Sequence, residues 1–126
     1  MMNKKFLFLL FIQFFLFFFF FSSKEKYELA VCAIFQDDAK YLPEWIEFHQ
    51  AQGVQKFYLY NNLSQDNYKK ILKPFIKKGL VKLIEWPFQQ ENLKDWNKIQ
   101  RNAYTHCIQE IKSNVTWCAF IDTDEF

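Results

Sequence analysis

Two aspartates near the end of the chain have the residue type and the spacing of a cation site. Asp122 and Asp124 directly follow the apolar stretch 115–121 and are separated by one threonine. Two carboxylates from one tight turn offer the hard oxygen ligands that Mg²⁺ and Mn²⁺ prefer, especially when substrate phosphates complete the shell. A solvated acidic turn is the alternative, because so short a pattern also arises by chance. The position at the end of an apolar strand favours metal binding.

Polar residues also follow two earlier apolar stretches. Asp37 and Asp38 come after residues 29–35, and Asp66 closes the polar segment 61–66. Side chains of this kind can hydrogen-bond ribose hydroxyls or the edge of a uracil ring. Ordinary turn and helix-capping chemistry is the alternative for all three aspartates.

Other reactive residue types show no catalytic spacing. His49 and His106 lie within expected helices without a carboxylate at ligand spacing. We therefore expect each ring to be hydrogen-bonded within the protein or exposed to solvent. Cys32, Cys107 and Cys118 form no C-x-x-C pair and lie in apolar stretches, which predicts buried thiols. One disulfide stays open as an alternative if the domain is exported. The tryptophans are expected to pack in the core or at strand ends: Trp45, Trp86, Trp96 and Trp117. Stacking of one of them on a sugar or a base is the alternative, and the sequence does not select which one.

The elements that must position these residues alternate along the chain. Apolar runs predict strands at 29–35, 54–60, 80–86 and 115–121, and helical spacing of apolar residues predicts helices at 41–52, 68–78 and 96–111. This β-α-β-α-β-α-β order predicts an α/β fold with a mostly parallel sheet and helices on both faces. Ligands of such sheets bind beyond the carboxyl ends of the strands. We therefore expect the site at the loops 36–38, 61–66 and 122–125.

The amino-terminal segment is typical of a targeting signal or a membrane anchor rather than of part of the domain. Residues 6–21 are apolar apart from Gln13, and they follow Lys4 and Lys5. A helix of this length reaches about 24 Å, between a signal peptide and a full membrane span. Bulky residues stand where a cleavage site needs small ones, which favours an uncleaved signal anchor over a cleaved signal peptide. We assign residues 1–23 to the anchor and 24–126 to a domain on the lumenal or outer side of the membrane.

Composition excludes several classes of function. The 126 residues allow one modest domain, and their net charge of +2 comes from Lys4 and Lys5 alone. Nucleic-acid binding needs a basic surplus that the rest of the chain lacks. With only two glycines, Gly53 and Gly79, the sequence contains neither the dinucleotide-binding nor the P-loop pattern.

Four blocks in this order resemble glycosyltransferase family 92, and they lie at residues 32–49, 53–62, 79–87 and 117–126. The resemblance implies a Rossmann-like GT-A domain that transfers a sugar, galactose, from a UDP-sugar to a glycan acceptor. It also implies a type II membrane protein of the secretory pathway, in which Asp122 and Asp124 hold Mn²⁺ or Mg²⁺ at the donor diphosphate. The positions that the resemblance places beside the nucleotide are Gln36, Asp37, Asp38, Asn61, Asn62, Ser64, Asp66, Gln100 and Asp122.

The resemblance also implies that the sequence is the donor-binding part of a longer domain. Phe126 closely follows the aspartate pair, whereas the family continues with an acceptor-binding half that supplies the catalytic base. We therefore expect an incomplete enzyme without full activity. As a separate departure, the family commonly has Asn-Glu at the positions of Asp37 and Asp38. Two alternatives stay open: a membrane-anchored noncatalytic remnant that binds a nucleotide or a partner, and a structural membrane protein that associates through its Phe-rich span.

Overall fold

A computed structural model describes Asn3 and residues 26–126. The elements follow in the order β1 (Tyr27–Phe35), α2 (Leu42–Ala51), β2 (Lys56–Asn61), α3 (Tyr68–Lys77), β3 (Val81–Glu85), α4 (Leu93–Ile111) and β4 (Val115–Phe120). The predicted alternation of strands and helices is confirmed, with bounds that differ by a few residues. The largest difference is at α4, which begins at Leu93 because the Asn92 side chain accepts hydrogen bonds from the backbone N–H groups of Lys94 and Asp95.

The four strands form one parallel sheet in the order β3-β2-β1-β4. The chain therefore moves outward from β1 to β2 and β3, and α4 then brings it back to the other side of β1. Val31 pairs with Phe57 on β2 and with Ala119 on β4, so β1 is the central strand that joins the two halves. The direction of the strand order reverses between β1 and β4.

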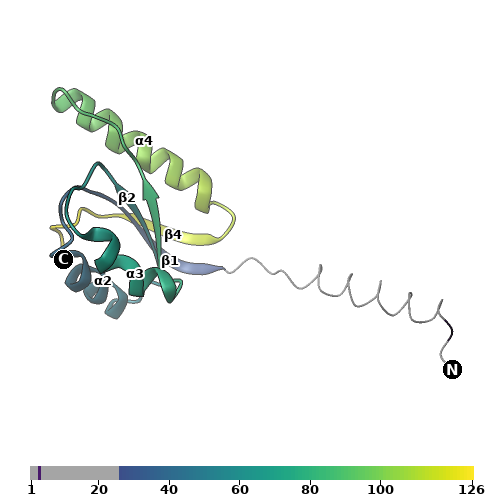
Figure 1. The fold of residues 1–126 in the computed structure, drawn as a ribbon. Coiled ribbons are helices and arrows are strands. Elements are labelled where there is room, and N and C mark those ends of the chain that lie inside the picture. The colour runs from purple at the N-terminus through teal and green to yellow at the C-terminus, as the bar shows by residue number, and fades with distance from the viewer. Residues whose placement is uncertain (1–2, 4–25) are drawn as a thin grey trace.

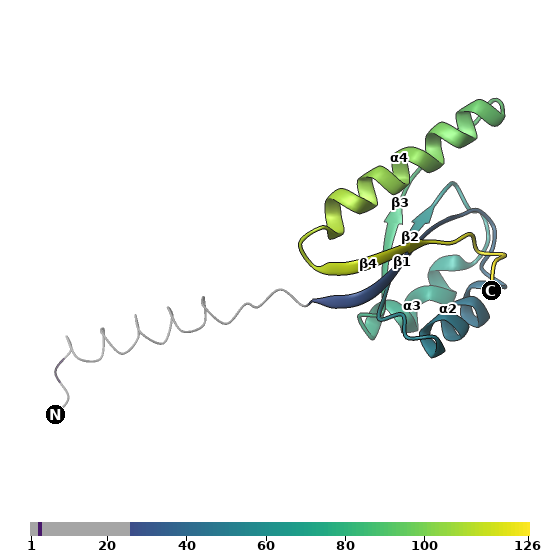
Figure 2. The same cartoon turned by 180° about the vertical axis from the view of Figure 1, so that it is seen from behind.

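Helices cover both faces of the sheet, as predicted. Figures 1 and 2 show α2 and α3 on one face and α4 on the other. Alternate residues of β1 supply the two cores: Val31, Ala33 and Phe35 pack with α2 and α3, whereas Ala30, Cys32 and Ile34 pack with α4. The continuous apolar run of β1 is thus explained by burial on both sides.

The two glycines end the two helices of the first face. Gly53 follows α2 with a φ of 103°, and Gly79 follows α3 with a φ of 73°. This left-handed region is open to glycine because it has no Cβ atom. The sequence predicted both helix ends from these residues.

Of the four tryptophans, Trp117 departs from the predicted packing, and that prediction is wrong. Its side chain is 68% exposed, because β4 is an edge strand that pairs with β1 alone among the described residues. The prediction for the cysteines is confirmed for Cys32 and Cys107, which are buried, while Cys118 is partly buried; all three thiols are free.

The predicted anchor segment, residues 6–21, lies outside the described residues. Across Asn3 and residues 26–126, no helix combines the length and the apolar character needed to cross a membrane.

Candidate functional site

A pocket of about 450 Å³ opens at the carboxyl ends of β1 and β4. Its lining comes from the end of β1 and the loop that follows, from the start of α4 and the loop that precedes it, and from the turn after β4. The lining residues are Ile34, Phe35, Gln36, Asp38, Gln90, Leu93, Trp96, Gln100, Asp122, Thr123 and Asp124. This is the point where the strand order reverses, and ligands of open α/β sheets bind at such a point.

Two side chains of α4 hold the carboxylate of Asp122. The Gln100 Nε2 and the Tyr104 hydroxyl both donate to Oδ1 of Asp122, each at 3.3 Å, and they lie one helical turn apart. Burial, together with the charge of Asp122 and the hydrogen bond to it, raises the pKa of Tyr104 well above its ordinary value. The hydroxyl therefore stays protonated near neutral pH and serves as a donor.

The backbone of residues 122–125 forms a tight turn that is also tied to the loop after β1. The Glu125 N–H donates to the Asp122 carbonyl at 3.1 Å, and the Asp122 N–H donates to the Glu125 carboxylate at 3.1 Å. Between them, the Thr123 hydroxyl donates to Oδ2 of Asp38 at 2.8 Å. This bond joins two segments that are 85 residues apart. Asp124 is exposed and bonds to no other side chain of the described residues.

The charged side chains of the pocket lining are all acidic. Asp38, Asp122 and Asp124 contribute three carboxylates, and among the described residues the lining contains no lysine, arginine or histidine. Among the described residues, no group of three or more His, Cys, Asp or Glu side chains is arranged to hold a metal by itself. Two hard carboxylates with room for further oxygen ligands still fit Mg²⁺ or Mn²⁺, because these ions commonly take one or two carboxylates and complete the shell with water and phosphate.

Asp37 and Asp66 lie outside the pocket lining and bind the loops after β1 and β2 to each other. Oδ1 of Asp37 accepts from the backbone N–H of Gln65 at 2.6 Å and of Asp66 at 3.2 Å. In return, the Asp66 carboxylate accepts from the N–H groups of Ala39 at 2.8 Å and Tyr68 at 3.2 Å. Asp37 adopts a φ of 58°, which a short polar side chain with local hydrogen bonds tolerates. Both aspartates thus perform the turn and capping chemistry that was their alternative assignment.

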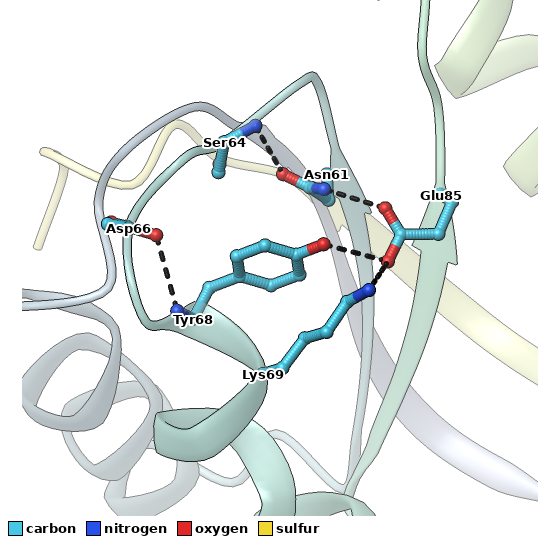
Figure 3. Close-up of polar contacts among 6 residues, drawn as sticks. All are labelled: Asn61, Ser64, Asp66, Tyr68, Lys69 and Glu85. Atoms are coloured by element: carbon cyan, nitrogen blue, oxygen red, sulfur yellow. Dashed lines mark hydrogen bonds and ion pairs between the residues drawn. The ribbon is translucent and has the colours of Figure 1, made fainter.

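Asn61 is buried at the end of β2 and organises the neighbouring strand and loop, as Figure 3 shows. Its Nδ2 donates to the Glu85 carboxylate at 2.7 Å, and its Oδ1 accepts from the Ser64 N–H at 3.1 Å. The Tyr68 hydroxyl donates to the same carboxylate at 2.9 Å, and the Lys69 ammonium lies 3.7 Å from it.

Asn62 holds the segment between β3 and α4. Its side chain is 1% exposed, and Nδ2 donates to the carbonyl groups of Trp86 and Phe88, both at 2.8 Å. These carbonyls belong to the segment between β3 and α4, which also supplies Gln90 to the pocket. The buried amide therefore fixes the path of that segment.

The structure thus divides the predicted site residues into two groups. Gln36, Asp38, Gln100, Asp122 and Asp124 meet at one pocket. The other five hold the loops around it, and their contact with a nucleotide stays a prediction: Asp37, Asn61, Asn62, Ser64 and Asp66.

Gln90, Thr123 and Tyr104 were not predicted from the sequence, and Trp96 was one of four tryptophans among which the sequence selects no ligand contact. Thr123 stands between the two aspartates. Tyr104 follows Gln100 by four residues, so helical spacing could have indicated Tyr104. Gln90 and Trp96 carry no such local signal, because the fold of the β3–α4 segment brings them to the pocket.

A family model, that of glycosyltransferase family 92, matches residues 26–126. A glycosyltransferase family 92 protein of Ricinus communis is 32% identical over 106 residues, which cover 83% of this chain and 17% of that protein. A family 92 protein of Oryza sativa is 30% identical over 104 residues, 82% of this chain and 16% of the relative.

The beta-1,4-galactosyltransferase galt-1 of Caenorhabditis elegans is also similar to this chain. It is 31% identical over 108 residues, which cover 79% of this chain and 25% of that protein. The matched region therefore spans between a sixth and a quarter of the length of these relatives.

Proposed function

The chain belongs to glycosyltransferase family 92, and we propose that it binds the donor in a metal-dependent transfer of a sugar from a UDP-sugar to a glycan acceptor. Galactose is the proposed sugar, which is supported by the name of the similar galactosyltransferase of Caenorhabditis elegans. We also propose that residues 1–23 anchor the domain to a membrane of the secretory pathway, with the domain on the lumenal side. The apolar segment 6–21 of the sequence supports this placement.

The acidic pocket is the observation that carries the metal dependence. Its lining contains Asp38, Asp122 and Asp124 and no basic side chain, so the described pocket offers no positive side chain to the diphosphate of a UDP-sugar. Carboxylates and a diphosphate in one pocket would repel each other, and a divalent cation held by Asp122 and Asp124 would offset this repulsion. When bound, Mn²⁺ or Mg²⁺ supplies Lewis-acid stabilisation of the charge on the leaving diphosphate.

The side chains of the pocket have separate tasks in this proposal. Asp122 and Asp124 would hold the cation, and Gln100 and Tyr104 orient the Asp122 carboxylate through their hydrogen bonds. Trp96 offers a flat apolar surface in the same pocket, which suits the base or the ribose of the nucleotide. Asp38 is engaged by Thr123, so its first task is to hold the turn.

Binding of UDP in the presence and absence of Mn²⁺ tests the proposal. A ligand that binds only the folded state at 100 times its Kd adds about 2.7 kcal/mol to the free energy of unfolding. We expect this stabilisation with UDP and Mn²⁺ together, and we expect it to vanish in the variant Asp122→Asn/Asp124→Asn. Differential scanning fluorimetry of the chain measures both effects.

A matched control separates a local effect from a change in net charge. The variant Glu44→Gln/Glu47→Gln removes the same charge from two exposed positions on α2 and should keep the Mn²⁺-dependent stabilisation. Stabilisation by UDP that is equally large without the metal, or that survives in the double asparagine variant, would contradict the proposal.

A further inference from the structure

A tryptophan of α2, on the face of the sheet opposite α4, donates to both ends of the turn at residues 122–125, here called the aspartate turn. Trp45 belongs to α2, and its indole N–H donates to the carbonyl of Asp122 at 3.1 Å and to that of Glu125 at 2.9 Å. These are the first and the last residues of the turn that carries Asp122 and Asp124. One donor thus joins the two ends of a segment that lies 77 to 80 residues further along the chain.

The Trp45 ring is itself held in place. It is fully buried, and it packs edge to face against Phe57 at 5.6 Å and against His49 at 4.8 Å between ring centres. His49 adds a second bond to the turn, because its Nε2 lies 3.2 Å from the Glu125 carbonyl. A carbonyl only accepts, so this nitrogen must carry the proton. The turn therefore rests on two rigid rings of α2.

The aspartate turn is supported from both faces of the sheet. Gln100 and Tyr104 reach the Asp122 side chain from α4, whereas Trp45 reaches the backbone from α2. A hydrogen bond to the side chain sets where one carboxylate points. A hydrogen bond to the backbone at both ends sets where the whole turn lies, and with it the separation of both carboxylates.

We propose that Trp45 is a positioning residue for the cation and the donor diphosphate: its indole N–H fixes the backbone of residues 122–125 so that both carboxylates face one pocket. This inference rests on the proposed function, in which Asp122 and Asp124 hold the cation. Groups that orient metal ligands commonly change the affinity for the metal by 10- to 100-fold when they are removed. We therefore expect the loss of the indole N–H to weaken Mn²⁺-dependent binding of UDP about tenfold.

The first experiment needs no ligand and measures amide hydrogen exchange in the full chain. In Trp45→Phe, which keeps a ring but removes the donor, the N–H groups of Asp122 and Glu125 should exchange several-fold faster. The N–H of Gln55, which donates to the Leu29 carbonyl, should exchange at an unchanged rate. Equal exchange at the turn in both proteins would overturn the inference.

The second experiment measures the affinity for UDP by isothermal titration calorimetry with and without Mn²⁺, well below the unfolding temperature. Trp45→Phe should weaken the Mn²⁺-dependent affinity about tenfold. The matched control is Tyr68→Phe, which keeps a ring but also removes one side-chain donor, the hydroxyl that donates to the Glu85 carboxylate. The control should leave the affinity unchanged. Faster exchange at the turn with unchanged affinity would overturn the positioning role.

The two experiments fail in different ways. If the unmodified chain shows no Mn²⁺-dependent binding of UDP, the proposed function fails, while the exchange result still decides whether Trp45 fixes the turn. If Trp45→Phe does not fold, Trp45→benzothienylalanine replaces it. That side chain has nearly the shape of indole, with sulfur in place of the N–H, so a loss of affinity there reports on the hydrogen bonds alone.

Discussion

At the scale of single residues, side chains of one type perform different tasks according to where their hydrogen bonds lead. Asp122 and Asp124 face a pocket, whereas Asp37 uses its carboxylate to hold two backbone N–H groups of the next loop. Asn62 is fully enclosed, and both of its carbonyl partners belong to the segment between β3 and α4. Polar residues at strand ends are therefore as important for building the loops as for lining the pocket.

Replacement of Asn62 by alanine tests this structural task. The variant Asn62→Ala removes the buried amide that donates to the carbonyl groups of Trp86 and Phe88, which costs about 1 to 3 kcal/mol. Urea unfolding with an unchanged m-value measures the loss. The exposed Asn102→Ala on α4 is the control and should change the free energy of unfolding by less than about 0.5 kcal/mol. Equal effects at the two positions would show that the Asn62 amide does not hold the loop.

At the scale of elements, Glu85 joins the end of β3 to β2 and to α3 (Figure 3). Partial burial acts to raise the pKa of Glu85, but hydrogen bonds from Asn61 and Tyr68, together with the Lys69 ammonium, outweigh it and lower the pKa below its usual value. A depressed pKa means that the folded state favours the charged carboxylate. Glu85 therefore contributes stability above the pKa of an unfolded glutamate, and this contribution is lost as the pH falls through the folded pKa.

The variant Glu85→Gln should reproduce this loss at neutral pH. We expect a decrease of about 1 kcal/mol in the free energy of unfolding at pH 7, because the half-exposed position weakens the charge interaction. The difference from the unmodified protein should shrink as the pH falls below about 4.3, where an unfolded glutamate is itself protonated. Urea unfolding over a pH series measures it. Glu47→Gln on α2 is the control, and a pH-independent difference at Glu85 would contradict the assignment.

At the scale of the whole molecule, the arrangement of the strands creates both the pocket and an open edge. The order β3-β2-β1-β4 places the end of β4 beside the end of β1, and the pocket forms between them. Among the described residues, the same order makes β4 an edge strand, on which Trp117 is 68% and Phe120 39% exposed. An exposed strand edge with apolar side chains is a template for pairing with another chain.

For the 126-residue chain, we expect self-association through the edge of β4. Trp117→Lys should lower it, because a charged side chain on an edge strand opposes pairing between chains. Ile108→Lys is the matched control, since it replaces another apolar side chain, 51% exposed, on α4 rather than on the sheet edge. Sedimentation velocity over a range of concentrations compares the three proteins. If both variants lower the association equally, the edge of β4 is not its origin.

The sequence by itself determined the elements and indicated a type of chemistry. Burial on both faces produces a continuous apolar strand, and helical packing produces apolar residues at steps of three and four, so local patterns sufficed for every described strand and helix. The position of Asp122 and Asp124 at the end of such a strand indicated a cation site. The resemblance of four blocks to glycosyltransferase family 92 added the family, which the comparisons confirm.

Only the tertiary structure decided which residues meet. The sequence nominated the carboxyl ends of three strands, and the structure places 36–38 and 122–125 at one pocket, whereas 61–66 lies on the other side of β1 and outside the pocket lining. The bonds of Trp45 to the turn and of Asn62 to the next loop also join distant segments. Periodicity records which face of an element is buried, but not which neighbour buries it, because strand pairing and helix placement follow from contacts across the whole chain.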